Sequence, residues 1–428
     1  MVKNDTGRPT LFRNRDFRQL FLADTLSQVG AEIAPIALPL VAVIALGATP
    51  LEAGLLTMFE TLAFLLVGLP AGAWVDRLPR RGVLIAADLG RAVVLATVPL
   101  AWWAGVLTIH QLFVVALLVG TGTVFFDTAY LSYLPSLVER DQLVEANARL
   151  QAVQSVAQVA GPGAGGLLIQ VLTAPFALVS TVIGNLWSAL LLSRVRSREQ
   201  TPQRPEKPHL GREIAEGMRF IFRYPMLRCT ALCTSTFNLF LSMGVPMLML
   251  LLARDLGLPA GTVGLILACG GVGGVLGTLL VNRLTSVLGQ GPVLWISAAT
   301  AGLAGLLLPL AQRDWRLVLV GLGQVVAGLG MIVYNVSLIS FRQAITPQRL
   351  MGRVNATWRF LVWGTMPLGG LLGGVLGNAI GPRATLWIAT LGTALSFLWI
   401  YFSPMRSMRE LPSTQEENGK SVTTTGAA

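Results

Sequence analysis

The sequence predicts an all-α polytopic membrane protein in which twelve spanning helices form two six-helix halves. The first observation is composition, because 53% of the 428 residues are hydrophobic and 12% are charged, whereas soluble proteins carry about 25% charged residues. The second is the length of the apolar runs, since about 20 residues are needed to cross a bilayer. The third is a repeat of polar residues at nearly one offset between the two halves.

Twelve apolar runs reach the length of a membrane span. They cover residues 17–46, 51–75, 82–104, 110–137, 142–171, 174–194, 224–253, 259–288, 291–311, 315–345, 349–379 and 382–404. We therefore predict a basic arm over 1–16, a first half over 17–194, a central loop over 195–223, a second half over 224–404 and a disordered tail over 405–428. The central loop ends in a basic amphipathic segment near 210–223, which is expected to form a short helix on the membrane surface.

Lys and Arg residues decide the expected orientation of the spans. The chain holds 32 of them against 21 Asp and Glu, for a formal net charge of +11. Most fall in the arm, the central loop, the tail and the connections on the same side of the membrane, whereas the other connections hold Arg254, Arg313, Arg316 and Arg383. Because cytoplasmic loops are enriched in Lys and Arg, both termini are expected in the cytoplasm, and the charge predicts no nucleic-acid partner.

Helices 1 and 2 carry acids inside apolar runs. Asp24, Gln28 and Glu32 form a polar stripe along helix 1, and Glu60 lies near mid-depth in helix 2. Acids inside membrane helices mark substrate or proton pathways by default. We predict that these residues line a cavity or couple protons, while the alternatives are that Asp24 reaches the inner interface and Glu60 forms a structural pair. Asp88 and Arg91 in helix 3 are predicted to be a structural pair.

The connection between helices 2 and 3 concentrates one acid and three arginines within a few residues. Its minimal reading is a water-facing loop that sets the orientation of the helices. The pattern G-x-x-x-D-R-x-x-R-R resembles the loop 2–3 signature of the major facilitator superfamily of secondary transporters. The resemblance implies an inner gate, with Asp127 near the inner end of helix 4 as a partner for the arginines. The gate residues are Gly72, Asp76, Arg77, Arg80, Arg81 and Asp127.

Helix 5 combines a glutamine face with a glycine motif. Gln154 and Gln158 lie on one face, which either contacts substrate or forms hydrogen bonds between helices. The motif contains Gly161, Pro162, Gly165 and Gly166. Glycines allow close helix packing and the proline favours a kink. G-P-x-x-G-G also resembles the antiporter motif of exporters in the superfamily, which favours export over import.

The two halves repeat each other. The pairs Pro39/Pro246, Asp76/Asn282, Asp127/Asn335 and Asn147/Asn355 lie at offsets of 206 to 208 positions in corresponding helices. Two six-helix repeats joined by a long central loop resemble the major facilitator fold, and within it the efflux and secretion-type branch that includes macrolide and siderophore exporters. Asn335 in helix 10 and Arg359 in helix 11 are further candidates for the substrate cavity.

Other classes lack their defining residues. A primary pump needs the phosphate-binding pattern G-x-x-x-x-G-K-[ST], of which only Gly419-Lys420-Ser421 is present, in the predicted tail. His110 and His209 are far apart in the sequence, and the three cysteines suggest neither a disulfide framework nor a metal site. We therefore expect no enzyme, metal or cofactor.

The resemblance implies a secondary active transporter that exports a small, largely apolar organic compound, such as a drug, an antibiotic or a secreted natural product, as a proton antiporter. The alternatives are an importer or proton symporter of the same fold, or a passive facilitator or channel. We expect a multi-pass monomer in the plasma membrane, whose partners are its small-molecule substrate, protons and the lipid bilayer.

Overall fold

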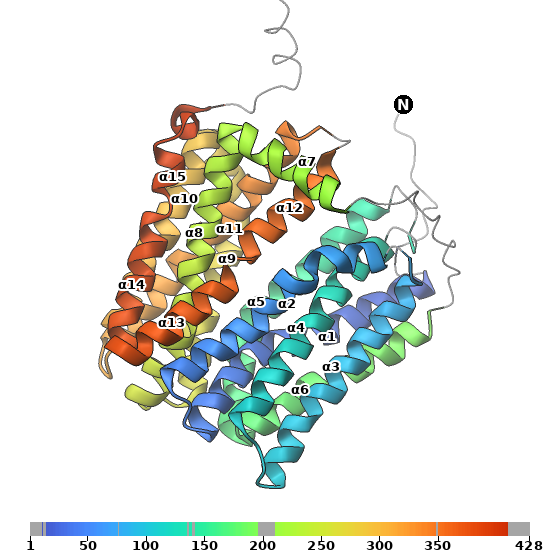
Figure 1. Ribbon diagram of the computed structural model, residues 1–428, viewed down its shortest axis with the longest axis vertical. Helices are drawn as coiled ribbons and strands as arrows, with labels where there is room; N and C mark the ends of the chain where they lie inside the picture. The colour runs from blue at the N-terminus through green and yellow to red at the C-terminus, as the bar shows by residue number, and fades with distance from the viewer. Residues whose placement is uncertain are drawn as a thin grey trace, which may run out of the picture. The chain divides into compact units, whose positions relative to one another are not determined.

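The computed structural model describes residue 11 and residues 14–75, 77–134, 137–138, 142–195, 210–347 and 350–409. These residues form helices joined by short turns and include no strand (Figure 1). The first six spans are α1 (Arg15–Leu40) with its π-helical end η2 (Val41–Ala45), α2 (Pro50–Val75), α3 (Arg80–Trp103), α4 (Ile109–Tyr133), α5 (Leu143–Leu172) and α6 (Ala174–Ser193). The predicted arm and tail fall largely outside the described residues.

The remaining spans follow a short helix, α7 (Leu210–Arg223). They are α8 (Pro225–Met249) with η4 (Leu250–Asp255), α9 (Ala260–Leu288), α10 (Gln290–Gly305) with η5 (Leu308–Leu310), α11 (Arg316–Ile345), α12 (Met351–Trp363) with α13 (Met366–Ile380), and α14 (Pro382–Leu395) with α15 (Leu398–Tyr401). A 3₁₀ turn, η7 (Pro404–Ser407), follows. Within the described part of the chain, twelve helical segments are long and apolar enough to cross a membrane, which confirms the predicted number of spans.

The chain divides into two compact units. Unit 1 comprises Met1–Ala48, Phe59–Glu206 and Pro259–Ala268, and unit 2 comprises Thr49–Met58, Lys207–Leu258 and Cys269–Ala428. The predicted boundaries of the arm, the halves, the central loop and the tail stay a prediction, and two helices are divided between the units. The start of α2 packs within unit 2, and the start of α9 packs within unit 1.

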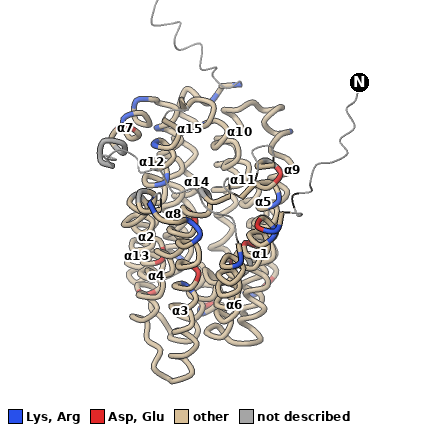
Figure 2. Tube along the Cα trace, turned by 90° about the vertical axis from the view of Figure 1, so that its right-hand side faces the viewer, with Lys and Arg blue, Asp and Glu red and all other residues tan. Residues whose placement is uncertain are grey.

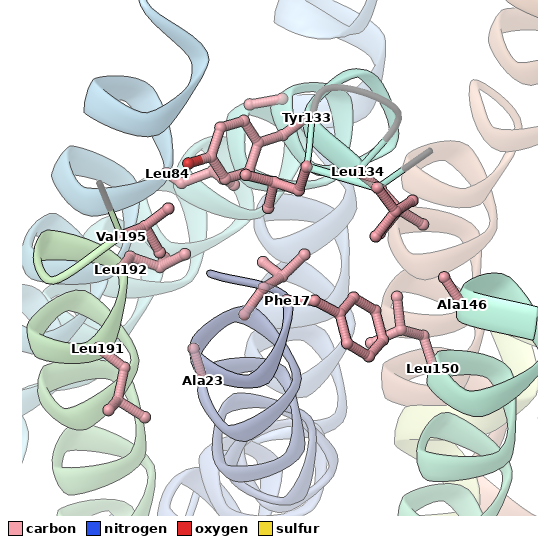
Figure 3. Packing of buried hydrophobic residues seen from close by; sticks show 14 of the residues in the cluster. Phe17, Ala23, Leu84, Tyr133, Leu134, Ala146, Leu150, Leu191, Leu192 and Val195 are labelled. Carbon is pink, nitrogen blue, oxygen red and sulfur yellow. The ribbon is translucent and has the colours of Figure 1, made fainter. Parts of the chain in front are cut away.

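The core of unit 1 gathers apolar side chains from most of its helices. Figure 3 shows Phe17 and Ala23 of α1 near Leu84 of α3, Tyr133 of α4 and Leu192 of α6. Phe17 and Tyr133 are fully buried. Where such side chains would otherwise face water, burying each one contributes about 1.5–3 kcal/mol. The cluster lies towards the end of the helices where the chain enters α1.

Unit 2 has a corresponding core that includes α7. Ile221 of α7 packs with Leu227 of α8, Phe341 of α11 and Val354 of α12. On the opposite face of α7, Arg219 and Arg223 are exposed. The sequence prediction of an amphipathic helix over 210–223 is therefore confirmed, while its position on the membrane surface stays a prediction.

The repeat inferred from the sequence recurs in the backbone. Thr173 between α5 and α6 has φ 77°, and Gly381 at the equivalent turn between α13 and α14 has φ 87°. Gly47 and Gly257, which follow the two π-helical ends, have φ 64° and 56°. Thr173 is the one described non-glycine residue with positive φ, a conformation that strains a β-branched side chain.

Two close glycine crossings also obey the repeat. Within unit 1, a Cβ added to Gly166 of α5 would lie 2.8 Å from the Cα of Gly264 in α9. Within unit 2, a Cβ added to Gly54 of α2 would lie 2.4 Å from the Cα of Gly374 in α13. Real Cβ atoms avoid such distances, so both crossings bring backbone against backbone, as small residues permit in membrane proteins.

Candidate functional site

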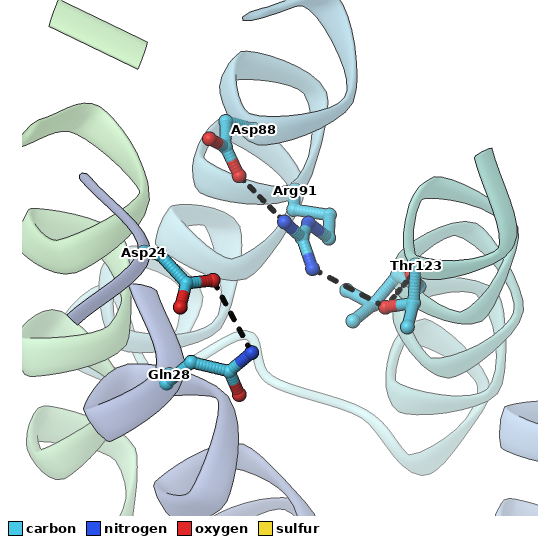
Figure 4. Close-up of polar contacts among 6 residues, drawn as sticks. Asp24, Gln28, Asp88, Arg91 and Thr123 are labelled. Atoms are coloured by element: carbon cyan, nitrogen blue, oxygen red, sulfur yellow. Dashed lines mark hydrogen bonds and ion pairs between the residues drawn. The ribbon is translucent and has the colours of Figure 1, made fainter. Parts of the chain in front are cut away.

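Unit 1 contains a polar cluster with side chains from α1, α3 and α4 (Figure 4). Asp24 of α1 is 2% exposed, and the Gln28 side chain donates a long hydrogen bond of 3.4 Å to its Oδ1 atom. Asp88 of α3 and Asp127 of α4 lie within electrostatic range of Asp24. The buried Tyr130 hydroxyl also faces Asp24, outside strict hydrogen-bond geometry. The structure thus places Asp24 inside the unit, and we call Asp24, Asp88 and Asp127 the acid cluster.

Arg91 is the cation of this region. Its guanidinium donates to Asp88 Oδ1 at 2.5 Å and to the Thr123 hydroxyl at 3.4 Å, and it lies 4.6 Å from the centre of the Phe126 ring. Gly122 makes room for the side chain, because a Cβ there would lie 2.7 Å from Arg91 Cγ. The predicted pair with Asp88 is present. The contacts of Arg91 with α4 were not predicted, although Gly122 and Thr123 on α4 were a signal that a long side chain could fit there.

Glu32 and Glu60 lie near the middle of their spans, which run over Arg15–Ala45 and Pro50–Gly68. Both side chains are partly buried, and neither has a hydrogen bond or ion pair with another described residue. Gly120 of α4 packs against the Glu60 carbonyl oxygen, which brings α4 close to the backbone of α2 at this point. Glu32 lies two helical turns beyond Asp24, about 12 Å along α1.

The glutamine face of α5 is less buried than the acid cluster. Gln151 donates a hydrogen bond of 3.2 Å to the Gln154 side chain, while Gln158 is exposed. This hydrogen bond lies within α5. The predicted hydrogen bonds between helices are not seen for Gln154 or Gln158 among the described residues. A substrate contact of Gln154 and Gln158 stays a prediction.

The predicted inner-gate residues separate into different environments. Asp76 lies outside the described residues, Arg77 is exposed, and a Cβ added to Gly72 would meet nothing within 4 Å. Arg81 donates to the carbonyl oxygens of Leu192, at 2.9 Å, and Ser193 at the end of α6. Cations stabilise helix C-termini, so Arg81 connects the start of α3 with the end of α6. Arg80 begins α3, and Asp127 belongs to the acid cluster.

The glycine motif of α5 makes three distinct contacts within unit 1. Gly161 packs against the Glu32 side chain, Gly165 packs against Ile33, and Gly166 forms the crossing with Gly264. Pro162 lies inside α5, and its carbonyl oxygen would be 2.5 Å from a Cβ on Gly264. Close packing, the simpler interpretation of the motif, is therefore observed.

Unit 2 contains a small cavity between α8, α10 and α11. The cavity is about 30 Å³ in volume, enough for about two water molecules. Its wall includes Phe237 and Asn238 of α8 and Tyr334 and Asn335 of α11. The Tyr334 hydroxyl lies 2.7 Å from the Thr234 hydroxyl, whereas the Asn335 carboxamide has no hydrogen bond with another described residue. The predicted cavity residue Asn335 thus brings a donor and an acceptor to the wall of this cavity.

A helix break adjoins the same cavity. The span Met351–Ile380 is interrupted between α12 and α13, just before Pro367, which lacks the N–H of a continuous helix. Asn238 donates to the Val362 carbonyl oxygen at 3.3 Å, and Ser235 donates to that of Leu361 at 3.3 Å. Discontinuous helices of this kind form binding sites in many transporters.

Arg359 lies one turn before the break. Its guanidinium lies 4.7 Å from the centre of the Trp363 ring. A cation over an indole ring is stabilised by about 0.5–2 kcal/mol. The aromatic contact is therefore made within the protein, and the predicted preference of Arg359 for an anionic or aromatic substrate stays a prediction.

Embedded charge differs between the two halves of the sequence. The first half carries Asp24, Glu32, Glu60, Asp88 and Asp127 inside its spans, whereas the spans after residue 224 hold no Asp or Glu except Asp255 at the end of η4. Figure 2 shows how sparse charged residues are along the helices. Apart from Asp255, the carboxyl groups within the spans thus belong to the first half.

The described residues contain no group of three or more His, Cys, Asp or Glu side chains that would hold a metal ion. Cys229, Cys233 and Cys269 are free thiols. The candidate sites are therefore the acid cluster, the mid-span acids Glu32 and Glu60, and the cavity in unit 2.

Twelve spans, a repeated set of six helices and polar groups buried at mid-span define a membrane transporter of the major facilitator type. The model of the family described as transmembrane secretion effector matches residues 8–424. The chain belongs to this family of the major facilitator superfamily, as the sequence resemblance predicted.

Two curated relatives are named as efflux proteins. The chain is 31% identical over 376 residues to the multidrug efflux pump Tap of Mycolicibacterium fortuitum, covering 84% of this chain and 88% of the relative. It is 24% identical over 369 residues to macrolide efflux protein A of Streptococcus pyogenes, covering 84% of this chain and 89% of the relative.

Solved structures confirm the fold. A point mutant of the nucleoside transporter NupG has a TM-score of 0.74 at 13% identity, covering 91% of this chain and all of that chain. A bacterial homologue of the iron transporter ferroportin, in an inward-facing state, has a TM-score of 0.74 at 17% identity, covering 92% and 98% of the two chains. At such identities the likeness concerns the fold alone.

Proposed function

We propose that this transporter is a secondary active exporter that removes small, largely apolar organic compounds from the cytoplasm by proton antiport. Family membership and the efflux names of its relatives support export. The observation that carries proton coupling is the confinement of embedded acids to the first half, with Glu32 near the middle of its span and without a charged partner among the described residues. We place the protein in the plasma membrane as a monomer with both termini in the cytoplasm, following the Lys and Arg distribution.

Alternating access gives the acids their role. A carboxyl group that is desolvated in one state and reached by water in another can bind a proton and then release it. A membrane potential supplies roughly 2.3 kcal/mol per charge per 100 mV, and a pH gradient supplies about 1.4 kcal/mol per unit. One proton per cycle therefore supports a substrate gradient of tens- to hundreds-fold. In this proposal Glu32 carries the proton, Asp24 and Glu60 adjust its path, and the loop bearing Asp76 and Arg77 gates the inner end.

The wall of the small cavity in the second half supplies one part of the contact with substrate, since its volume of about 30 Å³ admits only a small group. Its polar groups are carboxamides and hydroxyls rather than charges, and Phe237 adds an aromatic face. Such a surface fits an uncharged, partly apolar molecule with hydrogen-bonding groups. Asn335 is the residue we assign to this contact.

Everted membrane vesicles test the proposal directly. Vesicles that contain the wild-type protein, Glu32→Gln or no transporter are incubated in a medium that contains a panel of dyes and antibiotics, including a macrolide, with and without an imposed pH gradient. We expect gradient-dependent accumulation by the wild type, and only downhill movement by Glu32→Gln. Accumulation in the opposite direction identifies an importer, equal movement without a gradient identifies a facilitator, and unaltered uphill export by both Glu32→Gln and Asp24→Asn contradicts coupling through α1.

A further inference from the structure

Gly161 of α5 faces the side chain of Glu32 in α1. A Cβ added to Gly161 would overlap the Glu32 Cβ and would lie 3.1 Å from its Cγ. Gly161 is buried, and α1 packs along α5. The missing side chain at position 161 therefore creates the space that the stem of Glu32 occupies.

The neighbouring glycines show that this contact is specific to one position. Gly165, one turn further along α5, packs against Ile33, so successive turns of α5 meet successive residues of α1. Gly163 faces elsewhere, because a Cβ there would meet only the Ala268 Cβ at 3.6 Å, an ordinary contact distance. A methyl group should therefore be tolerated at position 163 and collide with Glu32 at position 161.

Among the described residues of α5 and α6, the two long helices that pack along α1, no charged side chain lies next to Glu32. Of the helices packed on α1, α6 carries no charged residue within its bounds, and α5 carries Glu145 and Arg149, which pair at 2.6 Å. Arg149 lies 12 residues before Gly161, about 18 Å along the helix. Asp24, on α1 itself, is about 12 Å from Glu32 along the helix. Packing against Gly161 of α5 is thus a contact that can fix this side chain.

We propose that Gly161 is a positioning residue for Glu32, so that the glycine motif of α5 and the embedded acid of α1 form one proton-responsive contact. Motion of α5 along α1 changes the space around Glu32, and the charge state of Glu32 changes how closely α5 can pack. The inference rests on the proposed proton coupling, since it assigns the motif to the group that takes up the proton.

Dicyclohexylcarbodiimide, which modifies protonated carboxyl groups in apolar surroundings, provides a test that needs no substrate. Purified wild-type protein, Gly161→Ala and the matched control Gly163→Ala are labelled between pH 5 and pH 9, and modification of Glu32 is quantified by mass spectrometry. We expect a pH-dependent labelling curve for the wild type and for Gly163→Ala, and a midpoint displaced by at least about one pH unit in Gly161→Ala. A curve unchanged in Gly161→Ala, or Glu32 labelling that does not depend on pH in the wild type, overturns the proposal.

A second comparison covers the case in which Gly161→Ala folds poorly. In Gly161→Ala with Glu32→Gly, the nearest remaining atom of Glu32 to the new methyl group is its Cα, at 3.6 Å. We expect the thermal midpoint of this double variant to return to that of Glu32→Gly alone. A double variant no more stable than Gly161→Ala contradicts the assigned contact. If the wild-type protein shows no proton-coupled export in the vesicle assay while Gly161→Ala still displaces the labelling curve of Glu32, the proposed function is rejected and the positioning role stands.

Discussion

Removing either charge of the Asp88–Arg91 pair should destabilise the protein far more than removing both. The two side chains are 0% and 7% exposed and lie 2.5 Å apart. Arg91→Met keeps much of the side-chain volume but leaves a buried carboxylate without its cation, and Asp88→Asn leaves a buried cation. Breaking a buried pair in this way costs about 3–5 kcal/mol, whereas replacing both partners is often close to neutral.

The coupling energy of the double-mutant cycle decides whether the pair behaves as a buried ion pair. We expect a coupling energy of about 3 kcal/mol or more, which is roughly a hundredfold in the unfolding equilibrium. Ordinary hydrogen bonds between membrane helices average about 0.6 kcal/mol in such cycles. The two expectations are far enough apart to be separated by experiment.

Equilibrium unfolding in mixed detergent micelles, followed by tryptophan fluorescence, measures the four free energies. The exposed pair Glu145–Arg149 on α5 is a matched control, since its side chains are 53% and 41% exposed. Arg149→Met should cost only about 0.3–0.5 kcal/mol. Additive effects of Asp88→Asn and Arg91→Met, or a cost no larger than that of Arg149→Met, would refute the reasoning.

Three further predictions concern the backbone and helix ends, and each is read from the free energy of unfolding. Thr173→Gly should stabilise the protein by about 1 kcal/mol, because it removes the strain of a threonine side chain at positive φ. Gly381→Thr at the equivalent turn should destabilise it by a similar amount, and effects of the same sign in both variants contradict this reasoning. Gly264→Ala should destabilise by more than about 1 kcal/mol because its Cβ meets backbone atoms, whereas Gly72→Ala, in open space within α2, should stabilise by about 0.5–1 kcal/mol. Arg81→Gln should cost about 1 kcal/mol by leaving the last carbonyl oxygens of α6 without this cation, and an unchanged stability would show that water replaces it.

The fold could be predicted from the sequence because a bilayer imposes strong local rules. Each span needs a long apolar run whose backbone hydrogen bonds are internal, so length and composition locate the helices one by one. The amphipathic helix over 210–223 was equally local, since its charged and apolar faces are set by helical periodicity. The break between α12 and α13 was not predicted, because Pro367 alone does not distinguish a kink from an interruption.

The candidate site was predicted only in part, because it depends on contacts between helices. Sequence reasoning selected Asp24 and Glu32 as embedded acids, but the placement of Asp24 near Asp88 and Asp127 follows from how α1, α3 and α4 pack. Arg91 was assigned to Asp88 from their spacing, while its reach to α4 required the space at Gly122. Asp76 was selected for its loop pattern and lies outside the described residues, so its gate role stays a prediction.

The two glycine crossings use the same pair of positions in the repeat. Gly54 and Gly264 are the fifth residues of α2 and α9, and Gly166 and Gly374 lie 208 positions apart in corresponding helices. The contacts pair Gly54 with Gly374 and Gly264 with Gly166. Position i of one repeat thus meets position j of the other, and the reciprocal contact is also made, which is the pattern of an isologous interface. A residue larger than glycine at one of these positions would therefore separate one pair of helices and leave the other pair in contact.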